Sequence, residues 1–239
     1  MARNQPEQQA PPVQRLRIRY AKRGRLRFSS HRDFSRAFER AIFRAHVPMA
    51  YSSGFNPHPR ISYAGAAPTG SASEAEFLEI GLAQVVDPAE IHAALLEALP
   101  DGLDVVEVVE SPGGALADQL EASRWQIDIE APLTEVAAAV AAFLAAESVL
   151  VERMTKKGLR EFDCRAAVLS LAALEGERGA RLDLVLRHGV PAVRPDDVLS
   201  GLARTSDLAP VETPLLTRLT QGPLDPETGE IGDPLRPRR

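Results

Sequence analysis

Residues 13–30 read VQRLRIRYAKRGRLRFSS, and this segment sets the start of the fold. Apolar side chains alternate with arginine over its first half, which predicts a strand with one buried face and one basic face. The buried face is expected to consist of Leu16, Ile18 and Tyr20. A turn is expected at 22–24, after which residues 25–28 resume the alternation. The segment therefore predicts an opening β-hairpin whose outer face is lined with arginine.

A helix is expected next, over residues 31–46, because apolar side chains recur there at every fourth position. The apolar row is Phe34, Phe38 and Ile42. Ser30 is a natural N-cap, since its hydroxyl can accept a hydrogen bond from a backbone N–H of the first turn. The opposite side carries a basic row of Arg32, Arg36, Arg40 and Arg44. Such a row is typical of a solvated helix face and also of an anion-binding one, so both interpretations stay open.

The remaining segments complete a βαββαβ order, the arrangement of ferredoxin-like domains. They are a loop with a short edge strand around 61–63, a strand at 75–82, a helix at 87–99 and a strand at 103–109. A second series follows the breaker at 112–114, and its order imitates the first. It comprises strands at 125–129, 149–154, 164–174, 181–186 and 215–219, and helices at 132–146 and 195–202.

These patterns predict an α+β fold of two tandem ferredoxin-like units with antiparallel sheets, at residues 14–112 and 121–222. The lead, residues 1–13, and the proline-rich tail, residues 223–239, are polar and are expected to be disordered. No apolar run reaches the roughly 18 residues of a membrane span, and the lead lacks the apolar stretch of a secretory signal. We therefore expect a cytoplasmic protein with no membrane association.

Cys164 is the single cysteine of the chain, which excludes an internal disulfide and any iron–sulfur or zinc site held by several cysteines. It is expected to be a small buried residue on a strand rather than a nucleophile, since no histidine is near it in sequence. The chain is therefore expected to bind no cofactor of its own.

Charge is distributed very unevenly along the chain, although the formal net charge is only -5. Residues 15–60 hold twelve arginine and lysine residues against two acidic residues, a local net charge of +10. Residues 61–110 hold ten acidic residues and no basic one, a local net charge of -10. A concentrated basic region attracts polyanions even on an acidic protein.

In a ferredoxin-like sheet the first and third strands are neighbours, which would bring Phe77 and Glu79 beside Arg17 and Arg19. Many proteins bind single-stranded nucleic acid with an aromatic ring among guanidinium groups, the base on the ring and the phosphate on arginine. Alternatively, Glu79 pairs with an arginine across the strands and the face is a charge-compensated interface. The residues alone do not decide between the two.

Two further segments contribute candidate ligand-binding residues. Ser30 and His31 lie at the start of the expected helix, where backbone N–H groups and the helix dipole favour an anion. The loop 52–60 is stiffened by two prolines and carries several polar side chains that could reach one ligand. The full candidate set is Arg17, Arg19, Arg25, Arg27, Ser30, His31, Arg32, Arg36, Asn56, His58, Arg60, Phe77, Lys156, Lys157 and Arg160.

Independent catalytic activity is not expected. The five histidines show no metal-ligand spacing, and the GxSxG, GxGxxG and GxxxxGK[ST] motifs are missing, so no catalytic or metal-binding residue is assigned. Histidine with arginine can still cleave RNA by metal-free general acid–base chemistry, which leaves a metal-independent RNA endonuclease as one alternative. A pure protein-docking scaffold, in which the charged segments bind each other or a partner, is the other.

Several motifs resemble a bacterial family of unknown function called radical-SAM-associated or radical-SAM-linked, whose members are fused to radical SAM proteins or encoded beside them. They are FSSHRD at 28–33, SSGFNPHPRIS at 52–62, Pro68-Thr69-Gly70, the segment 74–79 and TKKGLREFDCR at 155–165. The resemblance implies a radical SAM partner that carries a 4Fe-4S cluster and S-adenosylmethionine. We accordingly expect an accessory protein that binds RNA or another polyanion for that partner through its arginine-rich face. The expected tandem order is also similar to that of CRISPR-repeat-processing RNA endonucleases, a likeness of fold alone.

Overall fold

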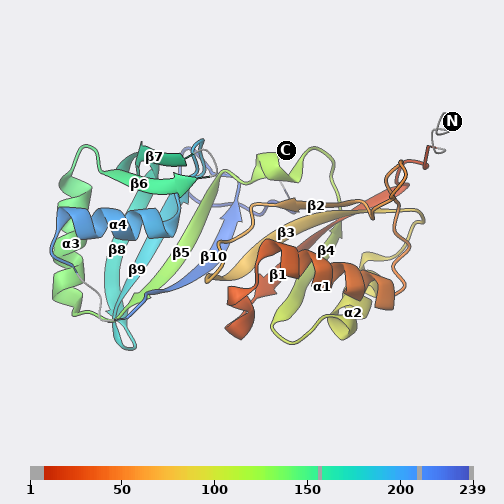
Figure 1. Cartoon of the computed structure of the whole chain (residues 1–239), viewed down its shortest axis with the longest axis horizontal. Coiled ribbons are helices and arrows are strands. Elements are labelled where there is room, and N and C mark those ends of the chain that lie inside the picture. Colours follow the sequence, from red (N-terminus) through yellow and green to blue (C-terminus); the bar gives the residue numbers. More distant parts are fainter. Residues whose placement is uncertain (1–7, 156–157, 209–211, 237–239) are drawn as a thin grey trace. The chain divides into compact units, whose positions relative to one another are not determined.

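The computed structural model describes residues 8–155, 158–208 and 212–236, and Figure 1 shows the course of the chain. The chain divides into two units, unit 1 with residues 1–118 and 235–239, and unit 2 with residues 119–234. Each unit combines antiparallel strands with helices, so the expected α+β class is confirmed.

Unit 1 is built around a sheet in which β1 is a central strand. Its elements are β1 (Gln14–Lys22), η1 (Gly24–Phe28), α1 (His31–Arg44), β2 (Ile61–Ala64), β3 (Ala72–Leu82), α2 (Pro88–Ala98) and β4 (Leu103–Glu110). The strand order is β4-β1-β3-β2, and every neighbouring pair is antiparallel. A short 3-10 helix, η2 (Leu116–Gln119), follows β4. Because β1 lies between β3 and β4, both of its neighbours come from the acidic segment 61–110.

The expected second strand of the opening hairpin is wrong. Residues 24–28 form the 3-10 helix η1, in which the N–H of Leu26 donates to the carbonyl of Arg23 and the N–H of Ser29 donates to that of Leu26. Gly24 has a φ of +55°, a conformation that glycine adopts at no steric cost and that bends the chain out of the strand. The arginines of this segment therefore do not extend the basic face of β1.

The core of unit 1 lies on one face of the sheet and explains why α1 forms where the sequence predicts. A single cluster joins side chains of β1, β3 and β4 to Phe34 and Phe38 of α1 and to Ile91 and Leu95 of α2. Both helices therefore pack on the same face of the sheet. The predicted cap is confirmed, since Ser30 forms a reciprocal capping box with Asp33.

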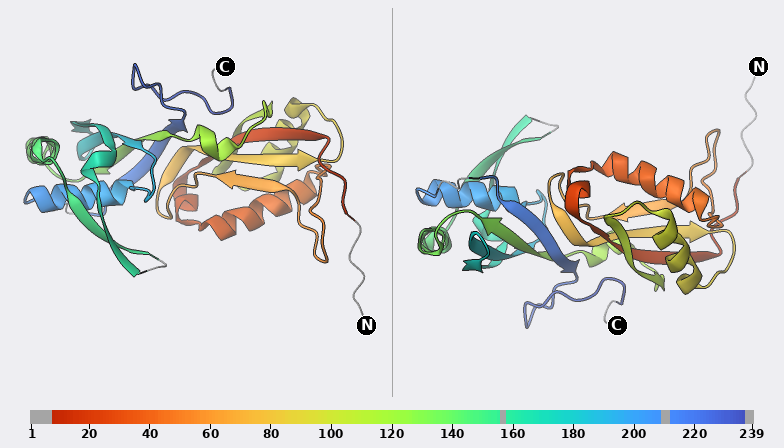
Figure 2. Two further views of the ribbon diagram at one scale, coloured as in Figure 1. Left: turned by 90° about the horizontal axis from the view of Figure 1, so that it is seen from above. Right: turned by 90° about the horizontal axis from the view of Figure 1, so that it is seen from below.

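Unit 2 repeats the order of strands in its main sheet. Its elements are β5 (Ala122–Ile129), α3 (Leu133–Ala145), β6 (Leu150–Thr155), β7 (Gly158–Asp163), η3 (Arg165–Ala167), β8 (Val168–Gly176), β9 (Gly179–Arg187), α4 (Pro195–Thr205) and β10 (Leu215–Gly222). The order within this unit is β10-β5-β9-β8, again antiparallel throughout. The strands β6 and β7 pair only with each other, as a separate hairpin that Figure 2 shows extending away from the sheet.

Two expected strands of unit 2 need correction. The strand at 149–154 exists as β6 but is not part of the main sheet, where β8 takes the corresponding position. The expected strand at 164–174 is interrupted by η3, because the carboxylate of Asp163 accepts the backbone N–H groups of Val149 and Arg165 and forms a corner there. Cys164 is fully buried, as expected, but it lies at this corner rather than on a strand.

The tail differs from the expected disorder over the part that the structure describes. Residues 223–236 include a turn in which the carboxylate of Asp225 accepts the N–H groups of Glu227 and Thr228. Leu224 and Ile231 form a bridge across that turn, and Leu235 is buried. The ends of the chain, 1–7 and 237–239, lie outside the described residues, as does part of the expected lead.

Among the helices that the structure describes, we find none with the length and apolar character needed to cross a membrane.

Candidate functional site

The register of β1 and β3 brings together the side chains that the sequence placed side by side. Arg17 lies opposite Glu79, and Arg19 lies opposite Phe77. These residues alternate with the apolar side chains that face the helices, so they occupy the other face of the sheet. The expected juxtaposition of arginine with an aromatic ring is thus present.

Arg17 is nevertheless fully buried, with 0% of its surface exposed. Its Nε donates to Glu79 at 3.2 Å, and one terminal nitrogen donates to the carbonyls of Gly113 and Gly114 at 2.7 and 3.0 Å. Ser111 also donates to the Glu79 carboxylate, at 2.7 Å. The guanidinium group is therefore held by groups of unit 1 and is closed to an external ligand.

The loop that supplies these carbonyls is shaped by glycine. Gly113 and Gly114 have φ angles of +90° and +69°, which other residues rarely adopt, and both carbonyls consequently point at the same nitrogen of Arg17. The sequence marked 112–114 only as a breaker. A pair of glycines shortly after a strand is the sequence signal for a loop whose backbone carbonyls can turn toward a buried cation.

The other cations of β1 and its following turn are also engaged. Arg15 pairs with Glu79 at 3.1 Å, and Arg19 donates from Nε to the carbonyl of Glu74 at 2.9 Å. Arg23 pairs with both Glu74 and Asp104, which raises its pKa. Phe77 is only 2% exposed, so Arg17 and Phe77, both expected to contact a ligand, are buried in the structure.

The outward side of α1 differs from the β1 face in that all of its arginines are exposed. Its buried side chains, Phe34, Phe38, Ala41 and Ile42, all face the core. The opposite side shows exposed Arg32, Arg36 and Arg40, one turn apart, together with Phe43, whose exposure is 78%. We call these four residues the α1 basic face. In the described part of the chain, none of its three arginines forms an ion pair.

Phe43 was missed by the sequence reasoning because it follows Ile42 and reads as part of the apolar row. Helical spacing gives the signal that identifies it, since residues three, four or seven positions apart share a face. Phe43 is three residues after Arg40 and seven after Arg36. These three side chains border an open hollow that is lined by Arg36, Glu39, Arg40, Phe43 and Arg44.

The N-terminus of α1 is already occupied by an anion of the chain itself. The carboxylate of Asp33 accepts the hydroxyl of Ser30 at 2.6 Å and the Ser30 N–H at 3.3 Å. These hydrogen bonds, followed by the nearby cations Arg36 and Arg32, lower the pKa of Asp33. His31 is exposed, and its ring stands edge-on to that of Tyr63 at 4.8 Å. Ser30 therefore serves as a cap, and we assign it no ligand.

The loop 52–60 does not join this end of the helix. Figure 2 shows the loop between α1 and β2 projecting beyond the C-terminal end of α1. The fourteen residues of α1 span about 20 Å, which separates the loop from Ser30 and His31. Asn56 and His58 are exposed, and Arg60 donates from Nε to the carbonyl of Tyr51 at 3.1 Å. The structure therefore does not bring the candidate residues of the loop 52–60 together with Ser30 and His31.

The remaining candidates lie apart from the α1 basic face in sequence. Arg25 is exposed on η1, and Arg27 covers the ring of Phe28, its guanidinium carbon 4.7 Å from the ring centroid. Arg160 is exposed on β7 of unit 2, directly opposite Arg153. Lys156 and Lys157 lie outside the described residues.

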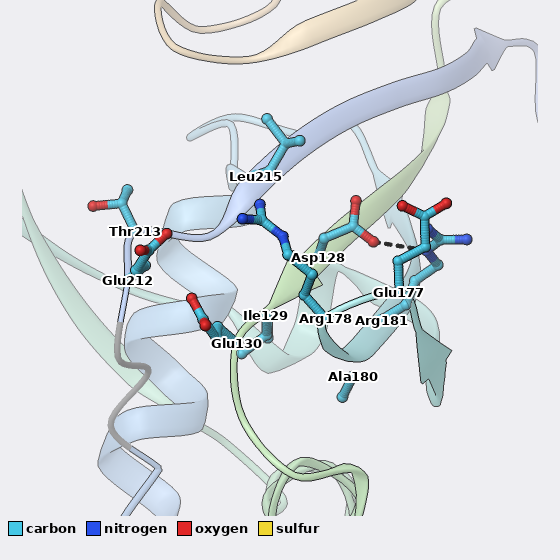
Figure 3. A pocket seen from close by; sticks show the side chains of 10 residues that line it. All are labelled: Asp128, Ile129, Glu130, Glu177, Arg178, Ala180, Arg181, Glu212, Thr213 and Leu215. Carbon is cyan, nitrogen blue, oxygen red and sulfur yellow. Dashed lines mark hydrogen bonds and ion pairs between the residues drawn. The ribbon is translucent and has the colours of Figure 1, made fainter.

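Unit 2 contains a separate polar cavity of about 120 Å³, shown in Figure 3. Arg181 pairs there with Asp128 at 2.7 Å. Three further carboxylates, from Glu130, Glu177 and Glu212, line the cavity together with Arg178, so its lining is acidic on balance. Such a cavity disfavours an anionic ligand.

The thiol of Cys164 is buried in unit 2. Burial, followed by the nearby carboxylates of Asp163 and Asp197, raises the pKa of Cys164 to about 11, which keeps its thiol protonated. Among these residues no three His, Cys, Asp or Glu side chains are grouped as metal ligands would be.

The chain is thus a mixed α+β protein of two antiparallel-sheet units, one of which displays an exposed basic helix. The model of a family described as "Uncharacterized protein conserved in bacteria (DUF2344)" matches residues 15–195. The match spans more than half of the chain, and the protein belongs to this family.

The other comparisons add little. A comparison with the curated proteins gave no match. Among the solved structures, one similar chain comes from the "Crystal Structure of a Cbf5-Nop10-Gar1 Complex", with 10% sequence identity and a TM-score of 0.48. The similarity covers 92% of this chain and 55% of that chain, so the protein spans little more than half the length of the similar structure. At this level of similarity the likeness gives no information about function.

Proposed function

We propose that the protein is a cytoplasmic accessory protein that binds a polyanion through the α1 basic face on behalf of a radical SAM enzyme. The observation that carries the proposal is the exposure of Arg32, Arg36 and Arg40 on one side of α1, with no ion pair among the described residues. Exposed, unpaired guanidinium groups at one-turn intervals are suited to successive phosphate groups.

The charge balance of this face supports an anionic ligand. Glu39 lies in the same hollow and offsets one of the three arginines, while Arg44 adds a further cation whose terminal nitrogen donates to the carbonyl of Ala98. The face therefore keeps a positive charge. It also lies on a unit in which Glu74, Glu79 and Asp104 already pair with the arginines of β1 and of the turn after it.

The radical SAM partner is proposed from the motif resemblance. The motif FSSHRD spans the end of η1 and the start of α1, and it includes Arg32 of the α1 basic face. A partner that carries a 4Fe-4S cluster and S-adenosylmethionine would supply the redox chemistry, because a single buried cysteine cannot hold such a cluster. This chain would then supply binding and presentation of the substrate.

We further propose that both units are ferredoxin-like βαββαβ modules, the second with the β6–β7 hairpin inserted. The support is the order of elements together with the strand orders β4-β1-β3-β2 and β10-β5-β9-β8. The module leaves one sheet face uncovered by its own helices, and in unit 1 that face holds the engaged arginines of β1.

A salt titration tests the polyanion proposal. Binding of a labelled single-stranded RNA and of inorganic polyphosphate is measured over a range of salt concentrations, with the wild type and with Arg36→Ala/Arg40→Ala. We expect tight binding at low salt, and a salt slope that falls by about 0.7 for each phosphate contact that the variant loses. Arg187→Ala, at an exposed arginine of unit 2, is the matched control and should bind as the wild type does. No binding of either polyanion at low salt rejects the proposal.

The partner proposal has its own test. The tagged full-length protein is purified from its native cells, and co-purifying radical SAM proteins are scored by mass spectrometry and by the visible absorbance of the iron–sulfur cluster. A radical SAM protein that persists through a salt wash supports the accessory role, and its repeated absence contradicts it.

A further inference from the structure

The α1 basic face has one feature that a purely electrostatic surface does not require, an aromatic ring at its C-terminal end. Phe43 is 78% exposed, more than the other two exposed phenylalanines, Phe28 at 60% and Phe55 at 64%. Its ring is bordered by Arg36 and Arg40 in the same hollow. We infer that this face binds single-stranded nucleic acid, with a base stacked on Phe43 and the flanking phosphates on Arg36 and Arg40. The inference rests on the proposed polyanion function and narrows its ligand.

The ring of Phe43 differs from that of the other exposed phenylalanine near α1. Phe28 is 60% exposed, but the guanidinium group of Arg27 already covers its ring at 4.7 Å. Within the described residues, Phe43 has neither a cation over its ring nor a stacked aromatic neighbour. One face of the Phe43 ring is thus open to a planar ligand.

Helical spacing places the charges where such a ligand needs them. Arg40 precedes Phe43 by three residues and Arg36 precedes it by seven, so both project from the same side of the helix. A single strand exposes the π-faces of its bases beside its phosphates, and proteins bind it with rings among cations. A duplex keeps its bases stacked inside, and an inorganic polyanion has no ring at all.

The arrangement favours single-stranded over double-stranded nucleic acid and does not distinguish one base sequence from another. Every base has a π-face, so stacking on Phe43 tolerates any of them. Base stacking and phosphate contacts are common to single-stranded RNA and DNA, so single-stranded nucleic acid is the ligand class that we assign.

The experiment compares variants of the full-length protein against three probes. The probes are a labelled oligouridylate of about 12 nucleotides, a duplex of the same length, and inorganic polyphosphate. The variants are Phe43→Ala, Phe43→Trp and the charge variant Arg36→Ala/Arg40→Ala. Met154→Ala, at an apolar side chain of unit 2 that is 72% exposed, is the control. Each substitution lies on an exposed side chain, so folding is retained, and circular dichroism verifies it.

The expected result is a selective loss. Phe43→Ala should weaken oligouridylate binding at least about fivefold, the effect of losing one stacked base, and leave polyphosphate binding unchanged. Phe43→Trp should keep the affinity for oligouridylate, the duplex should bind more weakly than the single strand, and Met154→Ala should match the wild type. The charge variant should lose affinity for every probe.

Two outcomes would overturn the inference in distinguishable ways. If Phe43→Ala binds oligouridylate as the wild type does while the charge variant loses all probes, the polyanion function stands and stacking is rejected. If the wild type binds none of the probes at low salt, the proposed function fails and the inference fails with it.

Discussion

Unit 1 carries arginines on two faces, β1 and α1, and their surroundings differ sharply. The arginines of β1 lie between two strands of the acidic segment, and Arg17 is buried against Glu79 and two backbone carbonyls. The arginines of the α1 basic face point away from the sheet and remain exposed. Side chains of one type within one charged segment therefore occupy two different environments, which local charge alone does not distinguish. What separates them is whether a carboxylate lies on a neighbouring strand.

The largest effect is expected at the buried arginine. Arg17→Ala should lower the free energy of unfolding by about 3 kcal/mol, because it removes the buried cation from the Glu79 carboxylate and leaves the carbonyls of Gly113 and Gly114 without their donor. Urea unfolding followed by circular dichroism measures the change. Arg36→Ala is the matched control on α1, and its change should stay within about 0.5 kcal/mol. Equal stabilities of these two variants would contradict the claim that Arg17 is held by buried contacts while Arg36 is not.

A smaller effect is expected at the start of α1. Ser30→Ala should cost about 1 kcal/mol of stability, since it removes the N-cap hydroxyl that Asp33 N–H donates to and that donates to the Asp33 carboxylate. The same variant should bind polyphosphate with unchanged affinity, because Ser30 is assigned to the helix and not to the ligand. A loss of affinity at unchanged helix content would instead place the anion site at this terminus.

Much of the fold follows from local patterns, and the exceptions have physical causes. Alternation predicts β1, and the i, i+4 row with Ser30 predicts α1, because each depends on neighbours close in sequence. The 3-10 helix η1 was missed, because five residues with alternating arginine and apolar side chains are too few to distinguish a strand from a 3-10 helix. The expected pairing of the first strand with the third, which brings Glu79 beside Arg17 and Phe77 beside Arg19, is also present.

The candidate site was predictable only in part. The basic row on α1 is a local pattern, and the structure keeps it exposed. The burial of Arg17 depends on the carbonyls of Gly113 and Gly114, which lie almost a hundred residues further along the chain, and on Glu79 from β3. No local pattern contains such contacts. Phe43 was overlooked because an apolar residue is ordinarily counted with the core.

The charge on Asp33 gives a smaller, pH-dependent comparison. Its folded-state pKa is lowered from the ordinary 3.8, first by the hydrogen bonds from Ser30 and then by Arg36 and Arg32. The ionised carboxylate therefore adds stability above the unfolded-state pKa, and this contribution is lost as the pH falls through the lower folded-state value. We expect Asp33→Ala to be less stable than the wild type at neutral pH and to approach it as the pH falls through the lowered folded-state pKa of Asp33. A difference that stays constant in acid would contradict this origin.

The smallest effect is expected in the loop 52–60. Because His58 lies beyond the opposite end of α1 from His31, the two histidines cannot act as one acid–base pair. His58→Ala should change RNA affinity by less than about twofold, and RNA incubated with either protein should stay intact. Cleavage by the wild type that His58→Ala abolishes would restore the endonuclease alternative.

The most direct test of the account is a nuclear magnetic resonance titration of the arginine side chains with a single-stranded oligonucleotide. With the full-length protein labelled on the arginine guanidinium nitrogens, the Nε–H signals of Arg32, Arg36 and Arg40 should shift and titrate together, while that of the buried Arg17 stays in place. A shift at Arg17 with the α1 signals unmoved would show that the ligand enters at the sheet, and would contradict the account.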